Sequence, residues 1–270
     1  MKTDADSTPN TFAERYNATL VPVIFQPWAR ELLRRMPPRD GDRVLDLACG
    51  TGVVTREVAH SGVTPGSLTG ADYNAGMLSV ARDRAAEAGI AAEWVEADAG
   101  DLPFPDDRFD VAYCQQAFQF FPDRPRALRE LRRVLAKGGR VAFCVQREID
   151  VNPMLKSQAE TLDKHVGPEA SAAVRAICGL PDGEEIRALF EDAGFEDVAV
   201  ESVSLMLHHP DGRAYAAGAM GGMHTGDKLS RLSDAERQQC IDDFLTGLGD
   251  CFDGMAMNFP HVSNVITARA

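Results

Sequence analysis

Apolar and polar positions alternate in blocks along the first half of the chain, and the blocks predict strands separated by helices. Short apolar runs, typical of buried strands, occupy residues 43–48, 67–72, 91–98, 109–116 and 140–146. Between these runs, apolar residues recur at helical spacing. Residues 74–89 predict one such helix, with Asn74 suited to its N-cap and Gly89 to its C-terminal end. Five strands that alternate with helices are typical of a parallel sheet in a doubly wound α/β domain.

The pattern changes in the second half of the chain. Residues 148–180 and 209–258 predict irregular helical segments, whereas residues 197–207 alternate like a strand. A helix with an acidic first turn is expected at 182–194, and the last ten residues can close the sheet as a further strand. At the other end of the chain, residues 11–36 predict an amphipathic helical stretch.

A glycine-rich turn follows the first predicted strand, in the sequence LDLACGTG (Leu45–Gly52). Glycine adopts positive φ angles without steric cost, and its missing Cβ lets backbone N–H groups approach a ligand. The start of the next helix adds partial positive charge. Asp72 lies 20 residues after Gly52, at the end of the next strand, where its carboxylate can accept hydrogen bonds from ribose hydroxyls. Both positions lie at strand ends, where open α/β sheets bind their ligands.

This turn suits either NAD or S-adenosylmethionine. The dinucleotide pattern G-x-G-x-x-G is matched at Gly50 and Gly52, but Thr55 stands at the third glycine position. Asp46, just before the turn, would repel a pyrophosphate and would instead suit the ammonium group of S-adenosylmethionine. The residues therefore favour S-adenosylmethionine without excluding NAD.

The chain resembles the class I S-adenosylmethionine-dependent methyltransferases, and in particular the small-molecule enzymes similar to those of ubiquinone and menaquinone biosynthesis. The resemblance covers about residues 43–147. It rests on VLDLACGTG, GADYNAGMLSVAR, VEADAGDLPFPDDRFDVAYCQQAFQFFPD and ALRELRRVLAKGGRVAF, which follow one another in the family's order and at its spacing. One departure is Ala48, where family members often have glycine.

The resemblance implies the domain organisation. A single Rossmann-like methyltransferase domain, 1–270, is expected, with a doubly wound, mostly parallel, seven-stranded sheet and helices on both faces. Its expected parts are an N-terminal helical cap (1–40), the cofactor-binding core (41–147), lid segments around the acceptor pocket (148–180 and 209–258) and two segments that complete the sheet (182–207 and 260–270).

The resemblance also implies which residues bind the cofactor, S-adenosylmethionine. Residues of the glycine turn are expected to border its methionine part: Asp46, Ala48, Gly50 and Gly52. Other residues are expected near the ammonium and carboxylate of that part: Tyr16, Cys114 and Gln115. The nucleoside is assigned to residues at the next two strand ends: Asp72 for the ribose, Tyr73 and Met77 against the adenine, and Asp98 and Ala99 at its amino group and ring.

The implied reaction is in-line displacement at the sulfonium methyl group by an oxygen, nitrogen, carbon or sulfur nucleophile. Holding the reactants in line can itself supply roughly 7–11 kcal/mol, so the absence of an obvious base does not argue against catalysis. Whether a base is used stays open, and one of the late histidines, with His224 as the first choice, could serve as one. Gln116 and Gln119, after the fourth strand, and His224 are candidates for contact with the acceptor. His224 belongs with His208, His209 and His261 to the late region that is expected to form the lid.

The charge composition limits the classes of molecule that the protein is expected to bind. Lys and Arg total 28 against 41 Asp and Glu, for a net charge of −13, which disfavours binding to nucleic acid or to an anionic membrane. We expect a cytoplasmic protein that acts on a small, partly apolar metabolite, holds no metal and could form a homodimer. Two alternatives stay open. One is a cofactor-binding protein of the same fold without methyl transfer, either a cyclase or a noncatalytic module, and the other is an NAD-dependent oxidoreductase.

Overall fold

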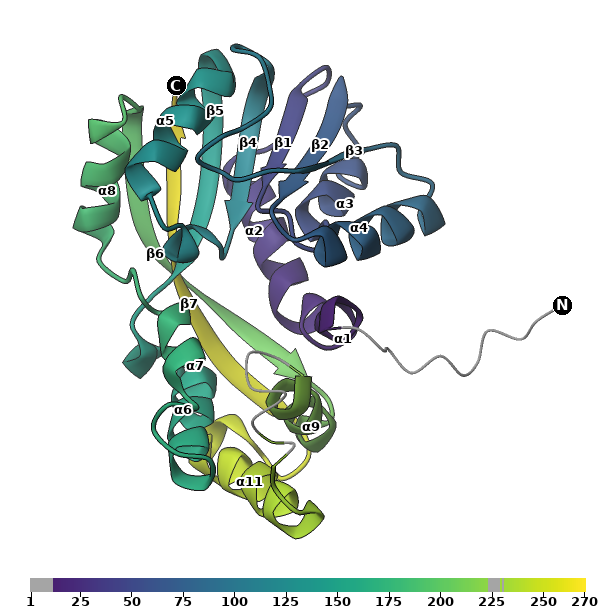
Figure 1. The fold of residues 1–270 in the computed structure, drawn as a ribbon, viewed down its shortest axis with the longest axis vertical. Coiled ribbons are helices and arrows are strands. Elements are labelled where there is room, and N and C mark those ends of the chain that lie inside the picture. Colours follow the sequence, from purple (N-terminus) through teal and green to yellow (C-terminus); the bar gives the residue numbers. More distant parts are fainter. Residues whose placement is uncertain (1–11, 223–228, 230) are drawn as a thin grey trace, which may run out of the picture.

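Seven strands form one mixed sheet in the order β3-β2-β1-β4-β5-β7-β6 (Figure 1). The computed structural model describes residues 12–222, 229 and 231–270. The strands are β1 (Arg43–Leu47), β2 (Ser67–Asp72), β3 (Glu93–Glu96), β4 (Phe109–Gln115), β5 (Leu135–Gln146), β6 (Glu196–His209) and β7 (Met257–Arg269). Strands β1 to β5 pair in parallel, and β7 runs antiparallel to both β5 and β6. The expected seven-stranded, mostly parallel sheet is therefore present.

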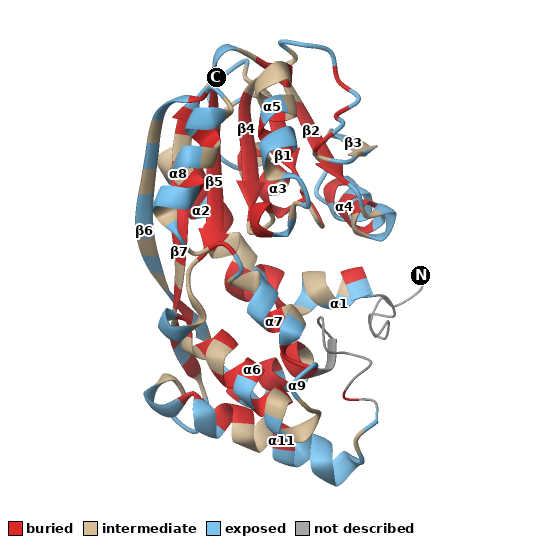
Figure 2. Ribbon diagram, turned by 60° about the vertical axis from the view of Figure 1, so that its left-hand side comes forward, coloured by how far each residue is buried: buried red, intermediate tan, exposed pale blue. Residues whose placement is uncertain are grey.

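Helices cover both faces of this sheet. On one face lie α2 (Gln26–Arg35) and α3 (Val53–Ala59), and on the other lie α5 (Arg124–Val134) and α8 (Gly183–Asp192). Helix α4 (Ala75–Glu87) packs on β2 and β3 and begins at Asn74, whose side chain accepts a hydrogen bond from the Met77 amide at 3.1 Å. Figure 2 shows that β1, β4 and β5 are buried between the two layers, whereas the edge strand β6 is largely exposed.

The antiparallel ribbon of β6 and β7 extends beyond the carboxyl ends of the other strands and carries a second helical layer (Figures 1 and 2). This layer contains α6 (Pro153–His165), α7 (Ala172–Ile177), α9 (Gly212–Gly222) and α11 (Asp234–Gly247). The N-terminal helix α1 (Phe12–Thr19) and a π-helical turn, η1 (Val21–Phe25), approach the same side and contact the helical layer through α9. Within the described residues, no helix combines the length and apolarity needed to cross a bilayer.

The ribbon corrects part of the sequence prediction. His208 and His209 lie at the end of β6, so they belong to a strand and not to an irregular lid segment. His261 lies inside β7, the last strand that the sequence predicts at 260–270. The two strands pair with each other from Glu196 and Arg269 as far as His209 and Met257. Because this pairing satisfies their backbone groups without the rest of the sheet, the strands continue past the sheet edge.

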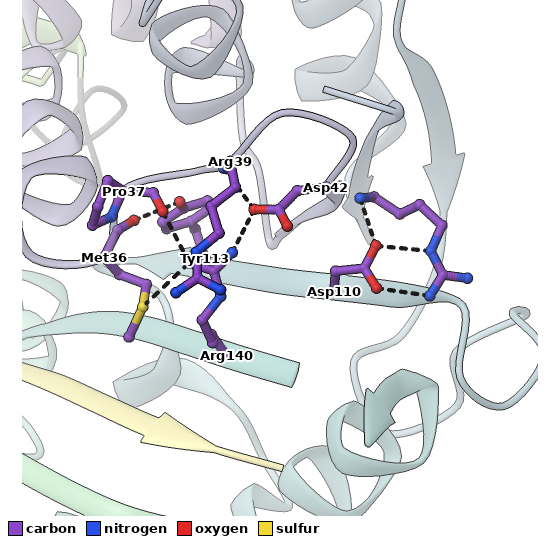
Figure 3. A network of polar contacts seen from close by, with 8 residues as sticks. Met36, Pro37, Arg39, Asp42, Asp110, Tyr113 and Arg140 are labelled. Atoms are coloured by element: carbon purple, nitrogen blue, oxygen red, sulfur yellow. Dashed lines mark hydrogen bonds and ion pairs between the residues drawn. The ribbon is translucent and has the colours of Figure 1, made fainter. Parts of the chain in front are cut away.

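A polar network ties the linker after α2 to the opposite, amino-terminal edge of the sheet (Figure 3). Arg140, at this end of the buried part of β5, pairs with Asp42 and donates a hydrogen bond to the Pro37 carbonyl at 2.9 Å. The Tyr113 hydroxyl donates to the Met36 carbonyl at 2.7 Å. The network anchors the N-terminal helices to the sheet, and those helices in turn form one wall of the cavity described next.

Candidate active site

A cavity of about 770 Å³ lies between the carboxyl ends of the parallel strands, the N-terminal helices and the helical layer. Its size is typical of small-molecule sites. One end, here called the sheet end, is formed by the turns after β1 to β4. The other, here called the helical end, is lined mainly by apolar residues of η1, α6 and α7, among them Leu20, Ile24, Met154, Leu155, Val174 and Ile177.

The glycine turn after β1 has the backbone that a close ligand approach requires. Ala48 and Gly50 both line the cavity with φ angles of 54° and 53°. A Cβ atom added at Gly50 would meet no atom within 4 Å, so the turn leaves open space at this position. Gly52 serves a different purpose, because a Cβ atom there would lie 2.5 Å from the Trp94 ring. Its missing side chain makes room for core packing, and it is not part of the cavity wall.

Asp72 organises the sheet end. Its carboxylate accepts hydrogen bonds from the Gly50 amide and the Asn74 amide, each at 2.8 Å, and so joins the turns after β1 and β2. The residue lines the cavity, and burial raises its pKa above the ordinary value. A carboxylate has about four acceptor positions, so this one keeps positions for the hydroxyl groups of a ligand.

Asp46 does not reach the cavity wall in this structure. Its carboxylate is buried and accepts two hydrogen bonds from Thr55 in the first turn of α3, from the amide at 3.0 Å and from the hydroxyl at 2.8 Å. Burial raises the pKa of Asp46 to about 7, against the lowering effect of these two hydrogen bonds. The observed contact is capping of α3, and contact with the cofactor's ammonium group stays a prediction.

The predicted nucleoside residues all line the cavity: Tyr73, Met77, Asp98 and Ala99. Tyr73 is 77% exposed and therefore lies at the mouth of the cavity, free to cover a ligand. Asp98 holds its own turn together, because one carboxylate oxygen accepts a hydrogen bond from the Gly100 amide at 2.7 Å. Arg126, which sequence reasoning did not assign to the cofactor site, lines the same cavity.

Two glutamines at the end of β4 line the cavity and carry side-chain oxygens without a partner among the described residues. Gln115 donates to the Phe25 carbonyl at 2.7 Å and Gln116 to the Ser263 hydroxyl at 2.8 Å, and among the described residues neither side-chain oxygen has a partner. Gln116 also has a φ angle of 53°, which is unusual for a residue with a side chain. Buried polar atoms without partners and strained backbone concentrate at ligand sites.

Of the remaining predicted residues, one lies in the cavity wall, two lie in the core, and one lies outside the described part of the chain. Tyr16 lines the cavity and stacks on Phe25 at 4.9 Å, and its pKa is raised by burial and by the negative charge of Asp72. Cys114 is fully buried in the core beneath the cavity, and Gln119 is buried and donates to the Gln116 carbonyl at 3.2 Å. Neither forms part of the described wall. His224 lies outside the described residues.

Sequence reasoning missed three polar residues of the helical end, Gln146, Gln158 and Tyr215, and named His261 only among the histidines of the expected lid. Tyr215 is buried, and its hydroxyl has no partner within the described part of the chain. His261 accepts a hydrogen bond at Nδ1 from the Trp28 indole at 2.7 Å. The alternating pattern around His261 marked a strand, but no local signal indicated which face of that strand meets the cavity.

The sheet end fits S-adenosylmethionine. Asp72 offers a preoriented carboxylate for a ribose, Gly50 leaves room for close backbone contact, and the wall beside them carries Tyr73, Met77 and Asp98 for a base. Within the described ranges, no group of three His, Cys, Asp or Glu side chains is close enough to hold a metal ion. The residues of this wall can bind and orient a nucleoside.

Comparison with known proteins agrees with this fit. A family model described as a methyltransferase domain matches residues 45–143. The chain is 36% identical over 181 residues to the 2-phytyl-1,4-naphtoquinone methyltransferase of Synechococcus elongatus, a match that covers 63% of this chain and 77% of that relative. It is 34% identical over 190 residues to the ubiquinone/menaquinone biosynthesis C-methyltransferase UbiE of Ectopseudomonas mendocina, covering 66% of this chain and 74% of that one.

A solved structure shows the same fold. It is a Haemonchus contortus N-methyltransferase in complex with phosphomonomethylethanolamine and S-adenosylhomocysteine, with a TM-score of 0.60 at 19% identity over 97% of this chain and 58% of that chain. The named relatives transfer methyl groups, so they do not favour the two alternatives of a non-methylating binding protein and an NAD-dependent oxidoreductase. The chain belongs to the class I S-adenosylmethionine-dependent methyltransferases, enzymes that here transfer the methyl group of S-adenosylmethionine to a small molecule.

Proposed function

We propose that the methyl acceptor is a partly apolar ring compound of the quinone or quinol class, bound at the helical end of the cavity. The observation that carries this proposal is the division of one cavity into two chemically different ends. The sheet end carries carboxylate side chains and a glycine turn whose backbone a ligand can approach, whereas the helical end is mainly apolar with a few polar groups. The two methyltransferases named above, from Synechococcus elongatus and Ectopseudomonas mendocina, carry quinones in their names, which agrees with an apolar, ring-shaped acceptor.

The proposal assigns the cofactor to the sheet end. Asp72 holds the ribose, while Tyr73 and Met77 cover the adenine. The rest of the predicted set keeps its assignment: Tyr16, Asp46, Ala48, Gly50, Gly52, Asp98, Ala99, Cys114 and Gln115. Among these, Asp46, Gly52 and Cys114 act from behind the wall, by supporting the turns that form it.

When bound, S-adenosylmethionine supplies an electrophilic methyl group on a positively charged sulfur. The chain's own residues then need to orient the acceptor and exclude water. Gln115 and Gln116 line the cavity at the end of β4, and an amide can align the acceptor but cannot take its proton at neutral pH. Leu20, Ile24 and Met154 supply an apolar surface that desolvates it. Orientation of this kind can lower the activation free energy by about 7–11 kcal/mol.

The proposal also includes the location of the enzyme in the cell, its binding partners and its lid segments. A cytoplasmic location, a free small molecule as the partner, and no nucleic-acid or membrane partner all agree with the net charge of −13. The lid role of segments 148–180 and 209–258 belongs to the proposal as well, because α6, α7 and α9 from these segments close the helical end. The homodimer stays a prediction from the sequence.

Calorimetric titration with S-adenosylhomocysteine tests the cofactor assignment. Asp72→Ala is expected to weaken binding about 100-fold, because two hydrogen bonds that the ribose hydroxyls donate to a charged acceptor are lost at once. Asp83→Ala, on the exposed face of α4, is the matched control and is expected to leave affinity unchanged. Unaltered affinity in Asp72→Ala would remove this residue from the ribose site.

The acceptor is tested by product mass. The enzyme is incubated with S-adenosylmethionine and a naphthoquinol that lacks the ring methyl group, and a product heavier by one methylene is expected. Compact polar acceptors such as ethanolamine are the comparison. Methylation of the polar acceptors alone would contradict the assignment to quinone-like rings.

A further inference from the structure

The side chains of Trp28 and His261 form a buried pair between α2 and β7. The indole nitrogen of Trp28 lies 2.7 Å from Nδ1 of His261, and the two side chains are 0% and 4% exposed. An indole N–H can only donate a hydrogen bond, so Nδ1 of His261 must accept it with a lone pair. Burial lowers the pKa of His261 to about 3, so the ring is neutral at physiological pH. A neutral ring with a lone pair on Nδ1 carries its proton on Nε2.

This Nε2–H group is available to a ligand. His261 forms part of the cavity wall, whereas Trp28 lies behind it. Within the described part of the chain, the imidazole makes no hydrogen bond other than the one from Trp28. Because the ring lines the cavity, this group can donate a hydrogen bond to an acceptor atom on a bound molecule.

Tyr215 supplies a second polar group at the same end of the cavity. Its hydroxyl is buried without a partner among the described residues, and its ring lies 6.2 Å from that of Phe259. Phe259 and His261 are two residues apart on β7, so their side chains share a face of the strand. Tyr215 and His261 therefore supply two hydrogen-bond donors at the helical end, whose wall is mainly apolar, and such an arrangement can recognise oxygen on a hydrocarbon ring.

We infer that His261 recognises an oxygen atom of the methyl acceptor, either a carbonyl or an oxyanion, by donating a hydrogen bond from Nε2, and that it does not act as a base toward the acceptor. The inference rests on the proposed function, since it places the acceptor at the helical end. Trp28 is the positioning residue, because its indole holds the ring in the Nε2–H form. A fixed neutral donor in an apolar surrounding favours negative charge that collects on the acceptor oxygen.

The tautomer can be measured without any acceptor. In the ¹⁵N-labelled wild-type enzyme saturated with S-adenosylhomocysteine, two-bond ¹H–¹⁵N correlation spectra distinguish a protonated Nε2 from a protonated Nδ1, and His261→Gln identifies the resonances. We expect His261 to carry its proton on Nε2 at pH 7.5. A proton on Nδ1, or a rapidly exchanging mixture, would overturn the inference.

Recognition of oxygen is measured with two probes that differ by one carbonyl group, 1-tetralone and tetralin, titrated into the S-adenosylhomocysteine complex. His261→Phe is expected to weaken 1-tetralone binding about tenfold and to leave tetralin binding unchanged, because only the ketone loses a hydrogen bond. His261→Gln, which keeps a donor near the position of Nε2, is expected to retain most of the affinity. Affinity for S-adenosylhomocysteine is expected to stay the same in both variants.

The outcomes separate the inference from the proposed function. An equal loss for both probes in His261→Phe would overturn the inference but leave the apolar acceptor site intact. Absence of binding by either probe, with S-adenosylhomocysteine still bound, would overturn both. If a variant fails to fold, spectra of the wild-type enzyme with the two probes test the inference instead. There, 1-tetralone is expected to shift the Nε2–H proton downfield and tetralin is not, and identical spectra with the two probes would overturn the inference.

Discussion

The two edges of the parallel sheet are built on opposite principles. At the amino-terminal edge, charged side chains are paired: Arg140 with Asp42, and Arg43 with Asp110 through two hydrogen bonds of 2.8 and 2.9 Å (Figure 3). At the carboxyl edge, several polar side chains are left partly unpaired. The side-chain oxygens of Gln115 and Gln116, for example, have no partner within the described residues.

Backbone conformation does not separate the two edges. Ala48 and Gln116, at the carboxyl edge, adopt positive φ angles of 54° and 53°, and Asp107 and Asp197, just before β4 and at the start of β6, adopt 57° and 52°. Such conformations cost about 1–3 kcal/mol each and persist where the surrounding structure enforces them. The two edges differ in their polar side chains, because the amino-terminal edge pairs its charges and the carboxyl edge keeps hydrogen-bonding capacity for a ligand. Substitutions at the two edges should consequently separate stability from binding.

The largest effect is expected at the amino-terminal edge. Arg140→Met keeps the bulk of the side chain but leaves Asp42, whose side chain is 11% exposed, without its partner. Breaking a buried pair from one side costs about 3–5 kcal/mol, so we expect the free energy of unfolding in urea to fall by that amount. Affinity for S-adenosylhomocysteine is expected to stay within twofold, as measured by calorimetry.

Arg30→Met is the matched control for this substitution. Arg30 pairs with Glu57 at 2.9 Å, but its side chain is 64% exposed, so its loss is expected to cost less than about 1 kcal/mol. Equal destabilisation by the two substitutions would show that the amino-terminal network stabilises the fold no more than an ordinary surface pair.

An intermediate effect is expected from the buried acid behind the carboxyl edge. The pKa of Asp46 rises from an ordinary 3.8 to about 7 in the folded protein, so the unfolded chain ionises first as the pH increases. The stabilising contribution is complete below pH 3.8 and is lost as the pH rises to about 7. A difference of one pKa unit between the folded and unfolded states corresponds to about 1.4 kcal/mol. The free energy of unfolding of the ligand-free enzyme should therefore fall by about 2 kcal/mol between pH 5 and 7 because of this residue.

Asp46→Asn tests this contribution, because an amide keeps an acceptor for the Thr55 amide and does not ionise. Urea unfolding of the wild type and of Asp46→Asn at pH 5, 6 and 7 measures the effect. We expect the difference in unfolding free energy between the two proteins to shift in favour of the variant as the pH rises. Parallel pH profiles would mean that Asp46 is already ionised in the fold, and that the carboxyl edge carries more charge than its contacts indicate.

The smallest effect is expected from relief of backbone strain. Ala48→Gly removes the Cβ atom from a residue with a positive φ angle and is expected to raise the free energy of unfolding by about 1 kcal/mol. Ala71→Gly, at a buried position of β2, has no such strain to relieve and is expected to lower it by about 1 kcal/mol. Chemical denaturation of both variants gives the comparison. A loss of stability in both would contradict strain at the carboxyl edge.

Much of the sheet end was predictable from the sequence. Asp72 and Gly50 are brought together by two consecutive strand-to-helix units, whose local patterns and turn chemistry are visible in the chain. Asp46 was predicted less completely. Its place before the turn was correct, but its hydrogen bonds go to Thr55, nine residues on, where a helix begins. The short β5 expected at 140–146 instead starts at Leu135, because pairing with its neighbours extends it beyond its apolar run.

By itself, the sequence determined the parallel core, the positions of its turns and the acid that holds the ribose in our proposal, because these depend on neighbours close along the chain. The tertiary structure alone decided the helical end. Trp28 and His261 are 233 residues apart and meet only because β7 enters the sheet antiparallel beside β5, in a register set by backbone pairing along both strands. A strand pattern states that side chains alternate, but which side faces a cavity depends on what packs against the strand.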